Sequence, residues 1–247
     1  MKFTKKINLK NSREKFFKDN KNFIFLISKR FNWMKKYIKN KKTIIEVGSG
    51  NCLIKNILSN KIICTDIFPL KNLSKKLDMD NFSLNKKFKK KVDIFIFNHS
   101  LHHSSNPQKL LKIISKNYLK KNGLVLINEP EISYVFRAFL TICDHEGYDL
   151  NIENRKKRLF WRQNNATGRH LFGKKKINDS FLNYKVKKNT LDECLVFLNS
   201  SGNGVDAPHI KLNNFFLKII DVLDFFLVKL SPSIFALNRS IVLKNTE

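Results

Sequence analysis

The stretch that decides the fold is TIIEVGSGNCL, residues 43–53. A short apolar run that contains Glu46 passes directly into Gly48-Ser49-Gly50 and then into a helical segment. Glycines at such a turn let the backbone approach a ligand closely, and the start of the following helix offers unpaired N–H groups. The pattern predicts a strand, a glycine turn and a helix, with a binding site at the turn. A tight turn without a ligand is the alternative.

Three further runs share the character of the first, being short and rich in Ile, Val and Phe. They are KIICTD, VDIFIFN and GLVLINE, at residues 61–66, 92–98 and 123–129. Such runs are typical of strands that are buried on both faces of a parallel sheet. Leucines and isoleucines at helical spacing lie between them, in residues 52–59 and 107–122. Strands that alternate with helices predict a doubly wound α/β fold.

The remaining segments fit one domain, residues 1–247, because the chain has no internal repeat and no Gly, Ser or Pro-rich linker. Residues 1–40 predict a helical extension of two short helices, and residues 42–130 are expected to contain the ligand-binding half of the fold. Residues 131–180 lack a sustained period and are interpreted as a lid-like insertion over the carboxyl ends of the strands. Residues 181–247 predict a strand at 181–187, a helix at 191–199, a helix at 213–230 and a last strand at 239–244.

The charge is unusually positive, with 48 Lys and Arg against 20 Asp and Glu, a net charge of +28. Only eight of these cations are arginines, although Arg is the residue that reads phosphates and bases. Lys, Asn, Ile and Phe all have A/T-rich codons, so we attribute the excess to genome composition and expect no specific nucleic acid partner. Selection for an anionic partner is the alternative.

Cysteine usage and hydropathy favour the cytoplasm. The four cysteines form no C-x-x-C pair, which argues against a disulfide framework or a zinc site. The first residues, MKFTKKINLKNSREKFF, are too polar for a signal peptide. No stretch approaches the roughly 18 uncharged residues of a membrane span.

A carboxylate stands twenty residues after Glu46, where Asp66 ends the next predicted strand. An acid in this place accepts hydrogen bonds from both hydroxyls of a ribose. The dinucleotide-binding pattern needs one more glycine, and Leu53 stands there instead. With these features, residues 42–130 resemble the class I S-adenosylmethionine-dependent methyltransferases.

The resemblance implies a Rossmann-like, mostly parallel, seven-stranded sheet that binds S-adenosylmethionine. The family's first motif is an acid followed by G-x-G-x-G, and Cys52 stands where the third glycine is usual. This departure either tightens the methionine end of the pocket or marks a degenerate site. The cofactor-binding residues that the resemblance implies are Glu46, Gly48, Ser49, Gly50, Asp66, Ile67, Asp78, Met79 and Asn98.

Methyl transfer from a sulfonium is an in-line displacement, so the protein supplies mainly alignment. A hydroxyl acceptor also needs a base to take its proton. The candidates are His102, His103, His145 and Glu146, with Asp144 as a further carboxylate. We favour His145 slightly, because His103 begins a helix and has a structural role available. The His-x-x-His-His pattern is the alternative of a metal site, but no carboxylate or Cys lies nearby at ligand spacing, so we expect no metal.

The sequence thus predicts methyl transfer to a small molecule, with a hydroxyl of a sugar or lipid-linked saccharide as the favoured acceptor. A looser similarity of residues 129–150, 165–174 and 198–205 to a bacterial subset associated with surface-polysaccharide biosynthesis motivates this choice. An RNA methyltransferase and a non-catalytic cofactor-binding scaffold are the alternatives.

The helix predicted at 213–230 is apolar on most sides and is therefore expected to be mostly buried, in the core or in a homodimer contact. Peripheral contact with a membrane is the alternative, and its mixed Asp and Lys residues argue against it. Whether the protein is a monomer or a homodimer stays open.

Overall fold

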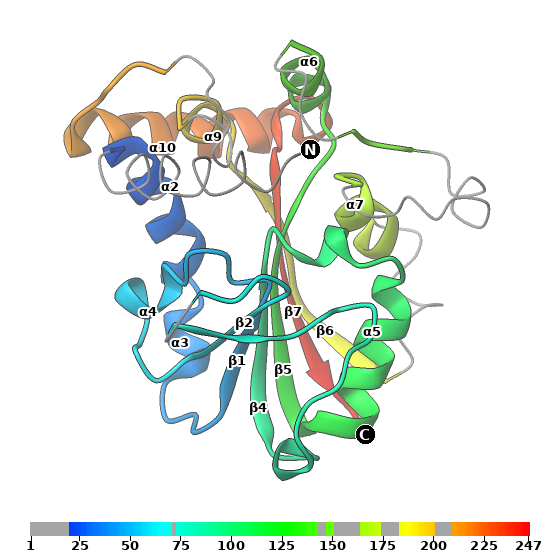
Figure 1. Ribbon diagram of the computed structural model, residues 1–247. Coiled ribbons are helices and arrows are strands. Elements are labelled where there is room, and N and C mark those ends of the chain that lie inside the picture. Colours follow the sequence, from blue (N-terminus) through cyan, green and yellow to red (C-terminus); the bar gives the residue numbers. More distant parts are fainter. Residues whose placement is uncertain (1–19, 71–72, 143–146, 151–163, 174–182, 201–208) are drawn as a thin grey trace, which may run out of the picture.

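The computed structural model describes residues 20–70, 73–142, 147–150, 164–173, 183–200 and 209–247. Seven strands in this part of the chain form one sheet, in the order β3-β2-β1-β4-β5-β7-β6 (Figure 1). The bounds are β1 Ile44–Val47, β2 Ile63–Asp66, β3 Ser74–Lys76, β4 Val92–Asn98, β5 Leu119–Pro130, β6 Tyr184–Asp192 and β7 Asn238–Asn245. β7 is antiparallel to both of its neighbours, and every other pair is parallel. The predicted Rossmann-like, mostly parallel, seven-stranded α/β fold is confirmed.

Helices lie on both faces of this sheet. Their bounds are α2 Lys21–Asn32, α3 Lys35–Ile38, α4 Ile54–Ile57, α5 Pro107–Ile113, α6 Tyr134–Ile142, α7 Thr167–Phe172, α9 Leu195–Leu198, α10 Asn214–Leu230 and α11 Pro232–Phe235. Short 3₁₀ helices span Lys86–Phe88 and Leu101–His103, and a π-helical turn spans Ile114–Tyr118. No helix in the described ranges is long and apolar enough to cross a lipid bilayer.

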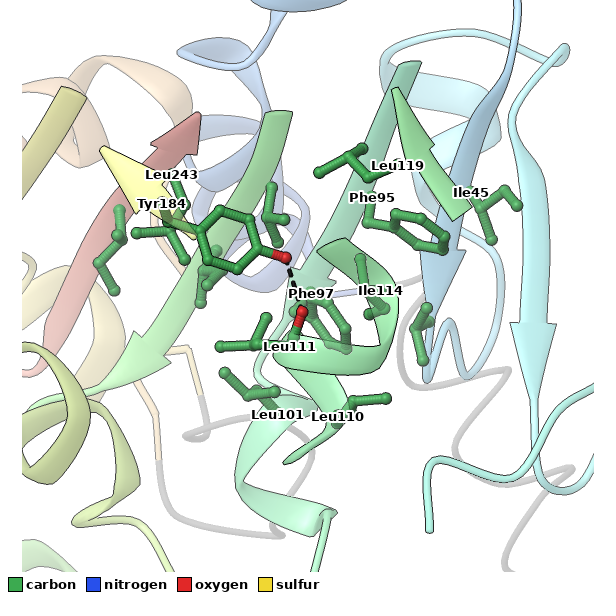
Figure 2. Packing of buried hydrophobic residues seen from close by; sticks show 14 of the residues in the cluster. Ile45, Phe95, Phe97, Leu101, Leu110, Leu111, Ile114, Leu119, Tyr184 and Leu243 are labelled. Carbon is green, nitrogen blue, oxygen red and sulfur yellow. Dashed lines mark hydrogen bonds between the residues drawn. The ribbon is translucent and has the colours of Figure 1, made fainter. Parts of the chain in front are cut away.

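The core consists of apolar layers on the two faces of the sheet. Alternate residues of a strand point to opposite faces, so Phe95 and Phe97 join one layer and Ile94 and Ile96 the other. Figure 2 shows the first layer, where α5 packs its leucines against Phe95 and Phe97. The hydroxyl of Tyr184 on β6 donates to the carbonyl of Leu111 in α5, at 2.7 Å, which ties the end of the sheet to this helix.

A buried ion pair attaches the N-terminal extension to the C-terminal half. The Arg30 guanidinium of α2 donates to both carboxylate oxygens of Glu193, which follows β6, at 2.6–3.0 Å. Both side chains are buried. The two short helices expected within residues 1–40 are confirmed as α2 and α3; residues 1–19 lie outside the described part.

The predicted boundaries of three helices are wrong, and those of one strand are shifted. The helix expected at 107–122 ends at Tyr118, because β5 already begins at Leu119. The helix expected at 191–199 is reduced to α9, since β6 continues to Asp192 against β7. The helix expected at 52–59 spans only the four residues of α4. The strand at 181–187 is found as β6, shifted toward the C-terminus.

The expected burial of the helix at 213–230 in the core of one copy is also wrong, whereas its burial in a homodimer contact stays a prediction. α10 forms there as predicted, but only Leu217, Asp224 and Val228 are buried. The helix lies over α2 and α9 at the edge of the molecule and not within the core (Figure 1).

Candidate functional site

The carboxyl ends of the parallel strands meet at one edge of the sheet, and the glycine turn lies at this edge. Gly48 and Gly50 have φ angles of +71° and +49°, in the left-handed region that favours glycine. A Cβ on Gly48 would stand 2.6 Å from Cβ of Ser100, so a side chain there would collide with the loop after β4. A Cβ on Gly50 would meet no atom within 4 Å. The backbone of Gly50 is therefore open to a ligand.

Asp66 holds this turn from the neighbouring strand. Its Oδ2 accepts a hydrogen bond from the amide of Gly50 at 2.9 Å, and its Oδ1 accepts one from the amide of Phe68 at 2.9 Å. Ser49 contributes its hydroxyl, which donates to the carbonyl of Thr65 at 3.2 Å. Ile67, next to Asp66, is 39% exposed. The carboxylate thus stands at the opening of the turn with further lone pairs available.

Glu46 lies beneath the turn. Its carboxyl group is buried, and the thiol of Cys64 on β2 donates to it at 3.7 Å. Burial, with a smaller contribution from the charge of Asp66, raises the pKa of Glu46 to about 8, although the Cys64 hydrogen bond opposes the shift. The side chain is therefore mostly protonated at pH 7.

Cys52 occupies the place of the usual third glycine. Its φ angle is +56°, the left-handed region, which explains why glycine is favoured at this position. Its side chain is 4% exposed and packs into the apolar layer with Ile54, Ile62 and Cys64. The thiol group thus fills the core.

The segment after β3 closes the next side of the site. Asp78 accepts hydrogen bonds from the Asp80 amide and the Asn81 side chain, both at 2.9 Å. Met79 reaches toward the glycine turn, since its Cε would stand 3.4 Å from a Cβ on Gly48. Asp80 accepts from the amide of Ser105 at 2.6 Å, which joins this segment to the loop after β4. The structure therefore brings the predicted residues of β1, β2 and β3 to one edge.

The end of β4 contributes two polar side chains, Asn98 and His99. The Asn98 side-chain oxygen accepts from the Asn128 amide group at 3.1 Å. His99 adopts a φ angle of +50°, and its Nε2 lies 3.0 Å from Oδ1 of Asn238. Removal from water, together with the charge of Arg30, holds the pKa of His99 well below its usual value. His99 is therefore neutral at pH 7.

Glu129, at the end of β5, organises the loop after β4. Its carboxylate accepts from the amides of Ser100 and Leu101, at 3.1 and 2.8 Å, and lies 2.8 Å from Nδ1 of His102. Glu129 and His102 are both buried. The half-buried His103 ring stands next, with its centroid 4.2 Å from that of His102. Sequence reasoning did not assign Glu129, although an acid that ends a buried strand was a visible signal.

The insertion is described only in part. Asp144, His145 and Glu146 lie outside the described residues. The described part contains α6 and α7, and in α7 a ring nitrogen of His170 stands 2.6 Å from the carbonyl oxygen of Asp149. Within the described ranges, no three His, Cys, Asp or Glu side chains are arranged to hold a metal ion.

These residues fit S-adenosylmethionine as a ligand. The open backbone at Gly50 gives close approach at the strand end, and Asp66 offers a carboxylate for a pair of hydroxyls. Met79 adds an apolar side chain next to the same turn, and Asp78 precedes it in the chain.

No family model matches the chain, and no curated protein matches it. Among solved structures, the chain is similar to a SAM dependent methyltransferase from Archaeoglobus fulgidus, with 16% identity over 89% of this chain and 93% of that one, and a TM-score of 0.49. It is also similar to the plantazolicin methyltransferase BpumL, solved with SAH, with 12% identity, 98% and 92% coverage and a TM-score of 0.48. A third is YcgJ from Bacillus subtilis, with 11% identity, 88% and 98% coverage and a TM-score of 0.47. Similarity this remote concerns the path of the chain and not its activity, so the description of the fold rests on the strand order itself.

Proposed function

We propose that this protein transfers a methyl group from S-adenosylmethionine to a small-molecule acceptor. One observation carries the proposal. The open glycine turn after β1 and the acid that ends β2 are joined by the 2.9 Å hydrogen bond from Gly50 to Asp66. Ligands of open α/β sheets bind outside the carboxyl ends of the strands, which is where this pair lies.

In this proposal, the residues of the glycine turn and Asp66 bind the cofactor directly, and a second group surrounds them. Gly48, Ser49 and Gly50 hold the cofactor through the backbone of the turn, and Asp66 binds the ribose hydroxyls. Around them, Ile67, Asp78, Met79 and Asn98 surround the rest of the site. S-adenosylmethionine supplies an electrophilic methyl group, so the protein's own task is to align the acceptor and to take up its proton.

The acceptor side lies beyond β4 and β5. We assign His103 or His145 as the base for a hydroxyl acceptor. His102 is a positioning residue in this proposal, because its ring is buried against Glu129 and held by a 2.8 Å hydrogen bond. A sugar hydroxyl or lipid-linked saccharide remains the proposed acceptor, and Glu146 remains a candidate base.

Calorimetric titration with S-adenosylmethionine and S-adenosylhomocysteine tests the proposal, because the heat of binding should report the loss of a proton from Glu46. A cation bound at the turn lowers the raised pKa of Glu46, which is about 8 in the free protein. Binding at pH 7 is therefore expected to release a proton, so the heat of binding depends on the ionisation enthalpy of the buffer.

The matched variant is Glu46→Gln, which resembles the protonated side chain in size and charge. It is expected to bind the cofactor with a heat that is the same in two buffers. Wild-type protein that takes up neither compound at millimolar concentration would show that the proposed function is wrong.

A further inference from the structure

α10 presents an apolar surface to solvent. Its exposed apolar side chains are between 43% and 79% accessible: Phe215, Phe216, Ile219, Val222, Leu223, Phe225, Phe226 and Leu230. The helix has 17 residues, and its buried side consists of Leu217, Asp224 and Val228. Continuous exposed apolar surface of this kind marks an interaction site in soluble proteins.

Both acidic residues of α10 are turned away from that surface. Asp224 is buried, and its carboxylate accepts from the amides of Cys194, Leu195 and Val196 at 2.6–3.2 Å, which caps the start of α9. Asp221 forms an ion pair with Lys29 of α2. The charge of Asp224 is therefore used inside the protein, and that of Asp221 is neutralised at the surface by Lys29.

The positive charges of α10 face outward. Lys218 and Lys229 are exposed beside the apolar side chains. Lys218 also lines a groove of about 720 Å³ between α2 and the start of α10, together with Lys21, Ile24 and Phe215. The outward side of the helix thus combines phenylalanines with lysines, while its one partly exposed acid, Asp221, is neutralised by Lys29. Phenylalanines beside lysines are typical of a helix that lies in a membrane interface.

Charge decides between a membrane and a second copy of the chain. A two-fold interface brings the same surface of both copies together, so the lysines of both α10 helices would enter one interface. Each copy also has a net charge of +28. An anionic lipid surface attracts these same lysines, while its interfacial region accepts the phenylalanines.

We propose that α10 docks on the surface of a lipid bilayer that contains anionic lipids. Figure 1 draws α10 and α6 at the same end of the molecule, and α11 contacts both. α6 directly follows β5, so this end is the one to which the carboxyl end of β5 points. Docking would thus bring the proposed acceptor side toward the bilayer. The docking itself does not depend on methyl transfer.

Vesicle sedimentation of the full-length protein tests this proposal. The vesicles contain phosphatidylcholine alone, or phosphatidylcholine with a third of phosphatidylglycerol. The apolar variant combines Phe215→Ser, Phe226→Ser and Leu230→Ser, and the charge variant combines Lys218→Gln with Lys229→Gln. All five side chains are exposed, so the fold is retained. The matched control removes two exposed lysines of β6, Lys185→Gln and Lys187→Gln.

We expect wild-type protein to bind the anionic vesicles and the apolar variant to bind at least about tenfold more weakly. Each lysine near an anionic surface contributes about fivefold, so the charge variant should lose about 25-fold while the β6 control stays within about twofold. Wild-type protein that ignores anionic vesicles would overturn the proposal. So would an apolar variant that binds like wild type, or a wild-type dimer in ultracentrifugation that the serine substitutions dissociate.

Discussion

Replacing His103 or His145 with alanine is expected to lower turnover by at least about a hundredfold in one of the two variants, without changing cofactor affinity. A general base contributes typically about 10²–10⁴-fold, because it removes the acceptor's proton as the methyl group arrives. The measurement is kcat at saturating S-adenosylmethionine, with cofactor binding and thermal unfolding followed in parallel.

His170→Ala provides the structural comparison for this experiment. A ring nitrogen of His170 lies 2.6 Å from a backbone carbonyl oxygen, and the side chain is buried. Its replacement should lower stability and leave turnover within a few-fold. If His103→Ala and His145→Ala both turn over within a few-fold of wild type, neither of these two histidines acts as base. Asp144, Glu146 or an acceptor that is already nucleophilic would then account for the reaction.

Asp66→Ala is expected to weaken binding of S-adenosylhomocysteine by about 30- to 150-fold, measured by calorimetry. A charge-assisted contact to two ribose hydroxyls contributes about 2–3 kcal/mol, and the substitution removes it. It also removes the acceptor of the Gly50 amide, while the amides of Gly48 and Ser49 keep their hydrogen bonds to the carbonyl of Thr65 in β2. Asp66→Asn retains one side-chain oxygen, so its affinity for S-adenosylhomocysteine should lie between those of wild type and Asp66→Ala.

Asp93→Ala is the matched control for this substitution. Asp93 lies in β4, where its carboxylate accepts from the amides of Lys42 and Thr43, next to β1's amino end. It therefore has comparable backbone contacts at the opposite end of the sheet from the turn. Its replacement should leave cofactor affinity unchanged. Equal affinity of wild type and Asp66→Ala would show that Asp66 does not bind the ribose.

Much of the fold could be predicted because the central strands are buried on both faces. β1, β2 and β4 are apolar through most of their length. Such runs can be recognised as buried strands without knowledge of the neighbouring strands. β3 was not predicted, since Ser74–Lys76 is a short, polar strand at the sheet edge. The start of β5 was missed for a related reason, because Lys120 and Lys121 resemble the polar end of a helix.

The candidate site could be predicted where it depends on residues close in sequence to the strand ends. The hydrogen bond between Gly50 and Asp66 follows from two neighbouring strands and a glycine turn. The role of Glu129 did not follow, because its partners Ser100, Leu101 and His102 are supplied by the pairing of β5 with β4. Local pattern contains no information on such pairing.

Tertiary contacts also explain why α10 lies outside the core, against the prediction. Its apolar residues are distributed nearly all round the helix, which predicts burial. The buried side nevertheless includes an acid, Asp224, because three backbone amides at the start of α9 need an acceptor. The phenylalanines are left outside, and this arrangement motivates the bilayer proposal.

The central claim is that the edge formed by the ends of β1, β2 and β3 binds the cofactor. Hydrogen exchange of the full-length protein, with and without S-adenosylhomocysteine, measures this most directly. The account predicts slower exchange in peptides that cover residues 47–53, 66–68 and 78–81, and unchanged exchange in 213–230. Absence of protection at the glycine turn, or protection confined to the groove between α2 and α10, would contradict it.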